Sequence, residues 1–332
     1  MAESPQAERA SRAPPAAGPR DAAGVRFGLL PWSQATEWPG LRDAALRAEA
    51  AGWESVWVWD HLMSIIGRDD QPILEGWTAL AGIAALTSQL RVGLMVGANT
   101  FRNPGLTAKL ATTLDHVSGG RAVLGLGGAW FEREHEAFGL EFGSSVGERL
   151  DWLDEAVGLL RRLLDGETVT WDGPRYHLQQ AFCRPLPVQA HLPILVGGSG
   201  PRKTLRTVAT HADAWNTSGH LPAVTERVRN LDAHCAAVGR DPMAIERTIS
   251  FPIVLRDDPI DATVAWDRLI RANGATDAGD VPHLLGRPEA VADSIRPYLD
   301  LGFSTVICRM PAPYDPETIE RIGELGAALA GP

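Results

Sequence analysis

Several classes of protein are excluded by what this sequence has little of. Its 332 residues include three cysteines (Cys183, Cys235 and Cys308), and no two of them have the CxxC spacing of a zinc or iron–sulfur site. No apolar run approaches the ~20 residues that a membrane-spanning helix needs. Lys and Arg number 31 against 41 Asp and Glu, so no basic nucleic-acid-binding face is expected. We therefore expect a protein with neither a nucleic-acid nor a membrane partner.

The first 23 residues lack the apolar core of a secretory signal peptide. They are rich in Ala, Pro, Arg and Glu, and we expect residues 1–23 to be a disordered leader. Residues 24–332 are expected to form a single domain. Scattered cysteines are typical of a reducing compartment, so the sequence predicts a cytoplasmic protein.

The motifs of several catalytic chemistries are also missing. His135 and Glu136 are followed by Gly139 where an HExxH motif would place its second histidine, so no metal site is expected. The two lysines, Lys109 and Lys203, are both expected on helices, which disfavours Schiff-base chemistry. There is no GxSxG nucleophile elbow. Enzymes of these three types are therefore not favoured.

Two carboxylates lie near predicted strand ends, as a glycoside hydrolase would require. Asp60 follows one strand directly and Glu132 lies shortly beyond another. Neither has an evident partner for the acid and base roles of that chemistry. The other residues at strand ends, mainly glycines and tryptophans, suit a large planar polar cofactor better than an activated water.

What the sequence does contain is an alternation of apolar β-type runs with helical patterns. The predicted strands are 25–30, 55–59, 90–96, a run within 118–128, 194–196, 214–216, 248–255 and 304–308. The predicted helices are 41–51, 77–86, 105–117, 146–164, 202–210, 223–238, 288–301 and 316–330. This alternation predicts an α/β fold, a (β/α)8 TIM barrel, with a hairpin insertion near Thr168–Tyr176 and an irregular acidic one near Asp257–Asp280.

A doubly wound open sheet is the alternative architecture. It is less favoured because the alternation runs through the whole chain. Gly125 and Gly127 also lack the third glycine of the GxGxxG turn that marks a dinucleotide-binding sheet.

Two glycine-rich stretches follow predicted strands and are candidate ligand sites. The first ends in Gly127, Gly128 and Ala129, where the absence of Cβ atoms would let backbone approach a flat ligand. The second is Gly197–Gly200, followed by Pro201, at which we expect a helix to begin. Backbone N–H groups at a helix start favour a phosphate. The alternative for both stretches is a connection whose glycines serve packing alone.

In combination these segments resemble the luciferase-like monooxygenase superfamily, and more narrowly its oxidoreductases that use the deazaflavin coenzyme F420. The resemblance covers nearly everything after Val25. The segments that carry it are 52–61, 100–104, 114–121, 118–135, 147–149, 185–189, 194–198 and 212–216. Their order and combination are more specific to the superfamily than to its F420 or FMN branch.

The resemblance implies roles for particular residues. Asp60 and His61 would lie against the deazaflavin and take part in catalysis. A non-prolyl cis peptide would lie at Gly97-Ala98, with Asn99 after it, and support the ring. The cofactor's edge would be lined by Gly127, Gly128 and Ala129. Its phosphate would be held by Gly197, Gly198, Ser199 and Gly200.

Two positions depart from the family pattern. Phe131 stands where many relatives have Asn, so a polar contact is expected to be missing. Gly128 stands where the sugar-phosphate dehydrogenases of the family have a catalytic Glu, which argues against a sugar-phosphate substrate and leaves the proton donor unassigned.

The function implied is hydride transfer between F420 and a small organic substrate. One alternative is an FMN-dependent monooxygenase that uses reduced flavin and O2, and another is a barrel that binds ligand without catalysis. A homodimer is also implied. Arg202, Lys203 and Arg206 are expected on one helix as a basic patch for the acidic tail of F420, which FMN lacks.

Overall fold

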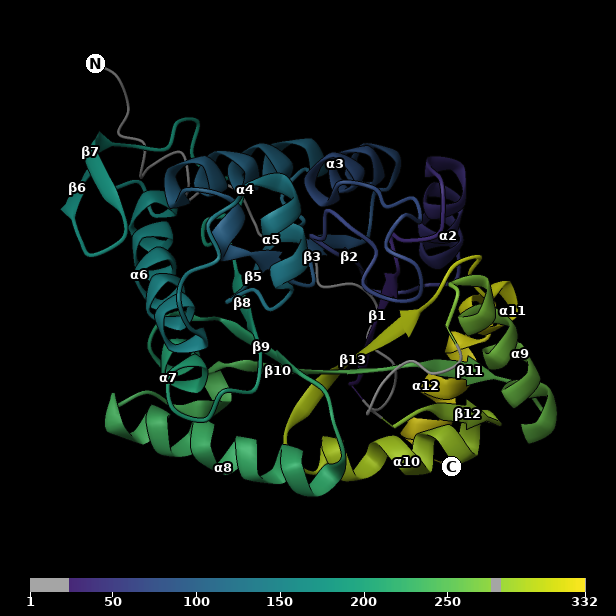
Figure 1. Cartoon of the computed structure of the whole chain (residues 1–332). Helices are drawn as coiled ribbons and strands as arrows, with labels where there is room; N and C mark the ends of the chain where they lie inside the picture. Colours follow the sequence, from purple (N-terminus) through teal and green to yellow (C-terminus); the bar gives the residue numbers. More distant parts are fainter. Residues whose placement is uncertain (1–23, 276–281, 332) are drawn as a thin grey trace, which may run out of the picture.

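The computed structural model describes residues 24–275 and 282–331, so the leader expected over 1–23 lies outside the described residues. Eight parallel strands form a closed ring (Figure 1). They are β1 (Arg26–Pro31), β2 (Ser55–Val58), β3 (Arg91–Leu94), β5 (Ala122–Gly127), β8 (Ile194–Gly197), β9 (Ala214–Thr217), β10 (Glu246–Phe251) and β13 (Phe303–Met310). β13 pairs with β1 and β3 pairs with β5, which closes the ring. The (β/α)8 barrel is confirmed, and closure excludes the open sheet.

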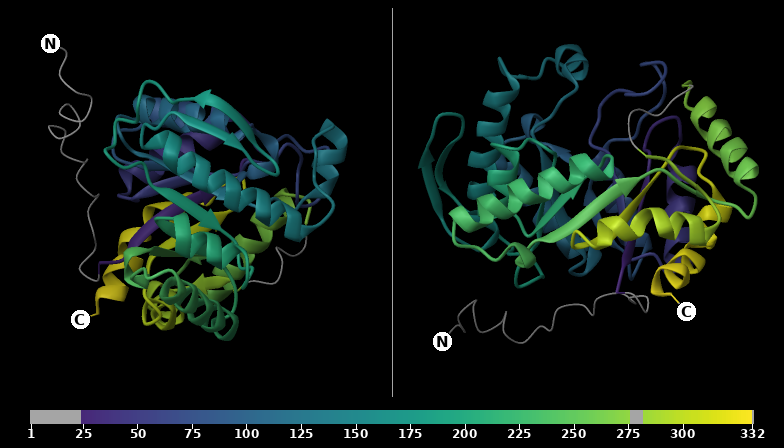
Figure 2. Two further views of the ribbon diagram at one scale, coloured as in Figure 1. Left: turned by 90° about the vertical axis from the view of Figure 1, so that its left-hand side faces the viewer. Right: turned by 90° about the horizontal axis from the view of Figure 1, so that it is seen from below.

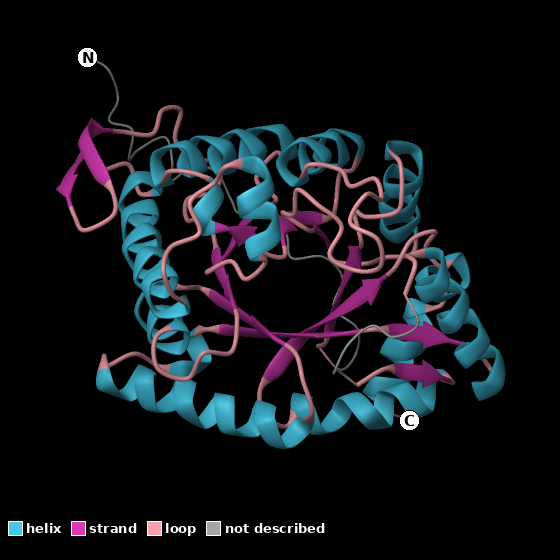
Figure 3. Ribbon diagram, viewed as in Figure 1, coloured by secondary structure: helices cyan, strands magenta, loops and turns pink. Residues whose placement is uncertain are grey.

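Most of the helices surround this ring on its outside, as the colouring by secondary structure shows, whereas α5 lies in front of the strands (Figure 3). The helices are α2 (Trp38–Ala50), α3 (Gly76–Leu86), α4 (Pro104–Ser118), α5 (Glu132–Phe138), α6 (Val146–Leu164), α7 (Thr204–His211), α8 (Leu221–Ala237), α9 (Pro259–Ala272), α10 (Pro288–Leu299), α11 (Pro316–Glu320) and α12 (Ile322–Ala330), with 3-10 turns η1 (Asn99–Phe101) and η2 (Pro242–Ala244). Side-chain caps define several starts; for example, Ser145 Oγ accepts from the Glu148 amide at the start of α6. None of the helices in the described chain is long and apolar enough to cross a membrane.

The predicted hairpin insertion is present. β6 (Val169–Asp172) and β7 (His177–Ala181) pair in antiparallel fashion. The second strand, however, lies wholly beyond the predicted range, which ended at Tyr176. The further views show this hairpin outside the ring of helices (Figure 2).

The prediction of an irregular segment over Asp257–Asp280 is wrong for most of its length. Residues 259–272 form α9, which Asp258 caps by accepting from the Ile260 amide. Ala262, Trp266, Leu269 and Ile270 form its buried face. Their spacing is helical, and the interspersed aspartates concealed it. Residues 276–281 lie outside the described part of the chain.

The predicted strand 248–255 is also divided. Pro252 has no N–H to donate to a ladder, and β10 ends at Phe251. The chain resumes as β11 (Ile253–Leu255), which pairs with β12 (Leu284–Gly286) in a small separate sheet.

The barrel interior is filled below its mouth by Trp57. This indole is 3% exposed and lies between two strands that carry glycine at the same level. A Cβ at Gly28 would lie 2.9 Å from Trp57 Nε1, and a Cβ at Gly93 would lie 2.6 Å from its six-membered ring. Trp59 packs in the same interior cluster, as the strand spacing of the two tryptophans predicts.

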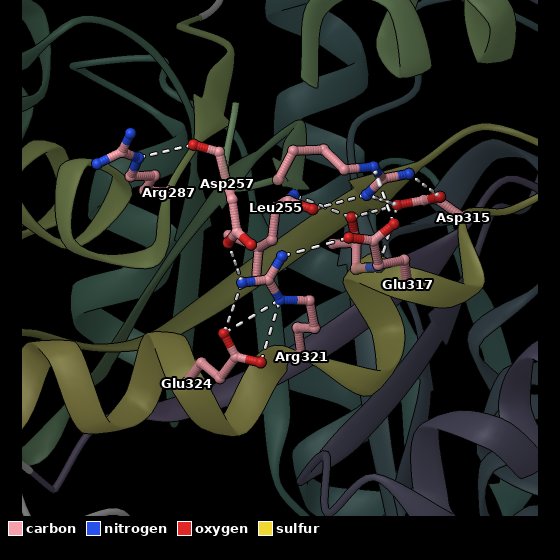
Figure 4. Close-up of polar contacts among 9 residues, drawn as sticks. Leu255, Asp257, Arg287, Asp315, Glu317, Arg321 and Glu324 are labelled. Atoms are coloured by element: carbon pink, nitrogen blue, oxygen red, sulfur yellow. Dashed lines mark hydrogen bonds and ion pairs between the residues drawn. The ribbon is translucent and has the colours of Figure 1, made fainter. Parts of the chain in front are cut away.

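A network of charged side chains joins the C-terminal helices to the loop that follows β11 (Figure 4). Arg321 lies among Asp257, Glu317 and Glu324 and pairs with all three. The hydrogen bonds that Arg321 donates to these carboxylates raise its pKa. The network draws residues of α11 and α12 to the loop that follows β11, and none of its members lines the cavity described below.

The closure between β3 and β5 requires glycine at residue 125. A Cβ at Gly125 would strike the Leu94 carbonyl oxygen, which is backbone and cannot rotate away. We expect Gly125→Ala to destabilise the protein by about 1–3 kcal/mol, or to prevent folding, as overpacking does. Gly323→Ala is the control, because no atom lies within 4 Å of its Cβ position, and its melting temperature should equal or slightly exceed the wild type's. Equal melting temperatures for Gly125→Ala and wild type in a thermal unfolding experiment would contradict this account of closure.

Candidate active site

A cavity of about 600 Å³ opens where the barrel strands end. It is lined by Leu30, Trp59, Asp60, His61, Ile65, Met95, Val96, Gly97, Ala98, Gly127, Gly128, Ala129, Trp130, Glu134, Val146, Leu150, Gly197, Gly198, Ser199, Gly200, Thr204, Asn216, Ser218, Ser250 and Arg309. The carboxyl end of a parallel barrel is where such folds bind their ligands. All the predicted site residues except Asn99 line this cavity.

Asn99 is directed elsewhere. It begins η1 and is 5% exposed, and its Nδ2 donates to the Tyr176 hydroxyl at 3.0 Å. Because Tyr176 immediately precedes β7, this hydrogen bond ties the end of the third barrel segment to the hairpin insertion. The structure therefore gives Asn99 a structural contact and no place in the cavity wall.

Asp60 is a buried carboxylate at the end of β2. Arg102 donates to both of its oxygens, at 2.7 and 2.9 Å, and the Ala98 amide donates to Oδ2 at 2.8 Å. Burial raises the pKa of Asp60 above its ordinary value, and these hydrogen bonds act in the opposite direction. With both oxygens engaged by the protein, Asp60 is arranged to hold the strand ends in place.

His61, the next residue, is paired with a carboxylate from another element. Its Nδ1 lies 3.0 Å from Glu134 Oε1, and the Leu62 amide donates to Glu134 Oε2 at 2.9 Å. A carboxylate only accepts, so Nδ1 carries the proton and Nε2 is left as the acceptor. The ring of His61 also meets Trp59 and Trp130 edge to face, at centroid distances of 6.1 and 5.6 Å.

Glu134 is not among the predicted site residues, although the sequence contains a signal for it. It is almost fully buried in the first turn of α5, whose neighbouring acids Glu132 and Glu136 are exposed. An acid at the third position after a helix start can turn back toward the preceding strand end. Glu132 stands closer to the strand and was therefore the acid predicted near the strand end.

The cis peptide expected at Gly97-Ala98 is found instead between Met95 and Val96. Gly97 and Ala98 form the short strand β4 (Gly97–Ala98), which pairs in register with Leu126 and Gly127 of β5. These two residues thus continue the ladder, and the irregular backbone falls between the two paired segments.

The glycines at the strand ends make room for other side chains of the protein. A Cβ at Gly127 or Gly197 would lie 2.7 or 2.8 Å from Val96, and one at Gly128 would lie 2.8 Å from Leu150. Val96 therefore occupies the space above two neighbouring strands and forms part of the cavity floor. The glycines act on the ligand site through Val96 and Leu150 rather than by bare backbone alone.

The loop Gly197–Gly200 retains free hydrogen-bond donors. Ser199 is exposed, and neither its amide nor that of Gly200 donates to any residue that the structure describes. The helix after it, α7, begins at Thr204 and not at Pro201 or Arg202 as expected. Three turn residues, 201–203, separate the loop from the helix. The free N–H groups of Ser199 and Gly200 therefore belong to the loop and not to the first turn of α7.

The expected basic patch beside this loop is wrong in part. Arg202 and Lys203 precede α7 instead of lying on it. Lys203 pairs with Asp151 at 2.6 Å, and Arg206 lies 3.8 Å from Asp154. Two acids on α6 thus compensate the positive charges of Lys203 and Arg206.

Two other arginines lie at the cavity, and neither is among the predicted site residues. Arg227 of α8 lines a side pocket of about 280 Å³ that shares Gly198, Ser199 and Asn216 with the main cavity. Arg309 of β13 lines the main cavity. The predicted strand ended at Cys308, so Arg309 lay outside it. Because side chains alternate along a strand, Arg309 faces the same side as Ile307, and this spacing was the signal that could have identified it.

A sequence model of the luciferase-like monooxygenase family matches residues 25–305, which is most of the chain. The chain belongs to the luciferase-like monooxygenase family. The family resemblance is thereby confirmed, and the protein is an oxidoreductase of a family whose members use F420 or FMN.

Relatives within the family carry several activities. A phthiodiolone/phenolphthiodiolone dimycocerosates ketoreductase of Mycobacterium sp. (strain JLS) is 35% identical over 262 aligned positions, covering 71% of this chain and 67% of the relative. An F420-dependent secondary alcohol dehydrogenase, solved with an F420–acetone adduct, has a TM-score of 0.79 at 20% identity, covering 92% of this chain and 99% of that one. A riboflavin lyase with modified FMN and riboflavin has a TM-score of 0.77 at 17% identity, covering 92% and 91%. At these identities the two solved structures show the shared fold alone.

The buried pair of Asp60 and Arg102 predicts a large effect of removing one partner. Arg102→Met would leave an uncompensated buried carboxylate and is expected to cost about 3–5 kcal/mol of unfolding free energy. This loss of unfolding free energy should become smaller as the pH falls. The pKa of Asp60 is raised in the folded state, so at low pH its carboxyl group is neutral and leaves no uncompensated charge. Urea unfolding at two pH values measures both effects.

Arg68→Met is the matched control for that prediction. Arg68 and Asp70 form an ion pair in which both side chains are largely exposed, at 77% and 67%. Its loss is expected to change stability by less than about 0.5 kcal/mol. Equal losses in the two variants would show that the Asp60 pair does not organise the strand ends.

Proposed function

We propose that the protein transfers a hydride between coenzyme F420 and a small organic substrate. The observation that carries the proposal is the His61–Glu134 pair at one side of a cavity whose other side holds the free donors of the Ser199 loop. The first can move a proton beside a reacting carbon, and the second can hold a phosphate. The ketoreductase relative, at 35% identity, supports a carbonyl or hydroxyl compound as substrate.

The residues present fit such a cofactor. The cavity volume of about 600 Å³ is within the range of sites for ligands of this size. Val96, supported by the glycines of β5 and β8, offers an apolar surface on which a planar ring can rest. The amides and hydroxyl of the Ser199 loop would hold the phosphate, and the side pocket with Arg227 adjoins that loop.

Once bound, F420 would supply hydride chemistry at its central ring. The chain's part is to position and to move a proton. His61 Nε2 is free to accept a proton from a hydroxyl substrate or, once protonated, to return one to a carbonyl substrate. Glu134 stabilises the imidazolium through Nδ1. Trp59 and Trp130 lie against the ring of His61 edge to face and leave Nε2 without a protein partner in the described chain.

An FMN-dependent monooxygenase is the second candidate, since FMN shares the ring and the ribityl phosphate of F420. The cavity floor and the Ser199 loop therefore support both cofactors. What favours F420 is Arg227, whose charge adjoins the phosphate loop and has no carboxylate partner in the described chain. An acidic tail extending past the phosphate would meet this guanidinium.

We expect the protein to bind F420 more tightly than FMN, and raised salt to weaken F420 binding more. Arg227→Met should reduce F420 affinity about tenfold and leave FMN affinity unchanged, whereas Arg229→Met, on the exposed face of the same helix, should change neither. Ser199→Asp should weaken both cofactors, because its carboxylate would face the phosphate. Fluorescence titration at two ionic strengths measures all of these.

Tighter FMN binding by wild type, or equal salt dependence for the two cofactors, would exclude F420 and favour the monooxygenase. Unchanged affinities in a correctly folded Ser199→Asp variant would place the phosphate elsewhere.

The His61–Glu134 pair predicts a loss of turnover without a loss of cofactor. His61→Asn should lower the rate of ketone reduction by reduced F420 about 100-fold or more, as expected for a lost general acid. Glu134→Gln offers an amide to Nδ1 in place of the carboxylate, and we expect at least a tenfold loss of turnover with unchanged cofactor affinity. Glu136→Gln, on the exposed face of α5, is the control. If Glu134→Gln kept the wild-type turnover, the carboxylate would have no part in the reaction at His61.

A further inference from the structure

Arg309 projects from the barrel wall into the cavity. It pairs in register with Leu30 of β1, and both residues line the cavity. Ile307, two residues earlier, belongs to the cluster that fills the barrel, whereas Cys308 and Met310 pack in the outer core against the helices. The alternation of β13 thus directs Arg309 inward, one layer above the filled interior.

This guanidinium has no partner among the residues that the structure describes. No hydrogen bond or ion pair joins Arg309 to any residue in the described ranges 24–275 and 282–331, although it is partly buried. Arg102, at the same mouth, is bound by Asp60 and Glu75. The buried Arg121 donates to the Ala84 and Thr87 carbonyls. Burial lowers the pKa of Arg309, but a guanidinium keeps its charge. A charge in this position is costly unless a ligand compensates it.

The order of the strands places Arg309 away from the phosphate loop. Around the ring, two strands, β9 and β10, separate β13 from β8, which leads to Ser199. One strand, β1, separates β13 from β2, which leads to His61. Apolar side chains line the wall between these two residues, namely Leu30, Trp59 and Ile65. A molecule that reached from His61 to Arg309 would cross this apolar wall and end at a cation.

We infer that the substrate carries a carboxylate, which Arg309 binds, and an apolar body that lies against Trp59 and Ile65. This inference rests on the proposed function, because it assumes that the reacting carbon lies beside His61. The planar fork of a guanidinium matches both oxygens of a carboxylate. The substrate class is then a keto or hydroxy acid with an apolar body, rather than a neutral ketone or alcohol.

The test uses three probes that share a phenyl ring and differ in their polar group: benzoate, its neutral counterpart benzamide, and phenyl phosphate. Isothermal titration of the full-length protein, with and without saturating F420, should show benzoate binding at least about tenfold more tightly than benzamide. Arg309→Met should abolish that difference, and Arg309→Lys should keep part of it. Arg229→Met, which removes an exposed arginine of α8, should leave benzoate binding unchanged.

Stability supplies a second measurement. Removing a charge that has no partner in the described part of the chain should leave the melting temperature of Arg309→Met equal to or above that of wild type. A marked fall would show that the arginine has a structural partner, and would overturn the assignment.

The remaining outcomes separate the alternatives. Equal affinities for benzoate and benzamide, or tighter binding of phenyl phosphate than of benzoate, would contradict the inference that the substrate carries a carboxylate. Loss of F420 affinity in Arg309→Met with benzoate binding intact would assign the arginine to the cofactor instead. A wild-type protein that binds benzoate but neither F420 nor FMN would overturn the proposed function and leave the anion site standing.

Discussion

The arrangement of the site depends on the carboxylate of Asp60. It joins the end of β2 to the Ala98 amide of β4 and, through Arg102, to Glu75. Glu75 in turn accepts from the Trp77 and Thr78 amides at the start of α3. One buried ion pair therefore connects two strand ends and a helix start. Because His61 is covalently next to Asp60, its position against Glu134 follows from that connection.

The contacts of Asp60 and His61 differ from the roles that the family resemblance implied for these two residues. The resemblance placed Asp60 and His61 together as catalytic residues. In the structure both oxygens of Asp60 are engaged by the protein, whereas His61 has one nitrogen engaged and the other available. The geometry favours a positioning role for the first and a proton-carrying role for the second. A buried carboxylate that exchanged protons would lose the contacts that hold the strand ends together.

The fold and the outline of the site could be predicted from the sequence because both depend on local patterns. The alternation of strands and helices gave the barrel, and the glycines at strand ends marked the cavity wall. What could not be predicted depends on contacts between distant residues. Glu134 reaches His61 from 73 positions away, and Asn99 is engaged by Tyr176 from 77 positions away. The acids of α9 concealed a helical face, and the division of β10 from β11 depended on a single proline.

The charges at the cavity explain how an acidic protein can attract an anion. The formal net charge is −10, yet the carboxylates that line the cavity are compensated. Asp60 is bound by Arg102, and Glu134 accepts from His61 and the Leu62 amide. Arg309 is the charged residue of the lining that nothing in the described chain compensates. Within a partly closed, largely apolar space this one charge outweighs the distant surface acids, because solvent and salt screen those acids more strongly. The net charge of the chain is therefore a poor guide to its ligand, and the local pairing of each charge is the better one.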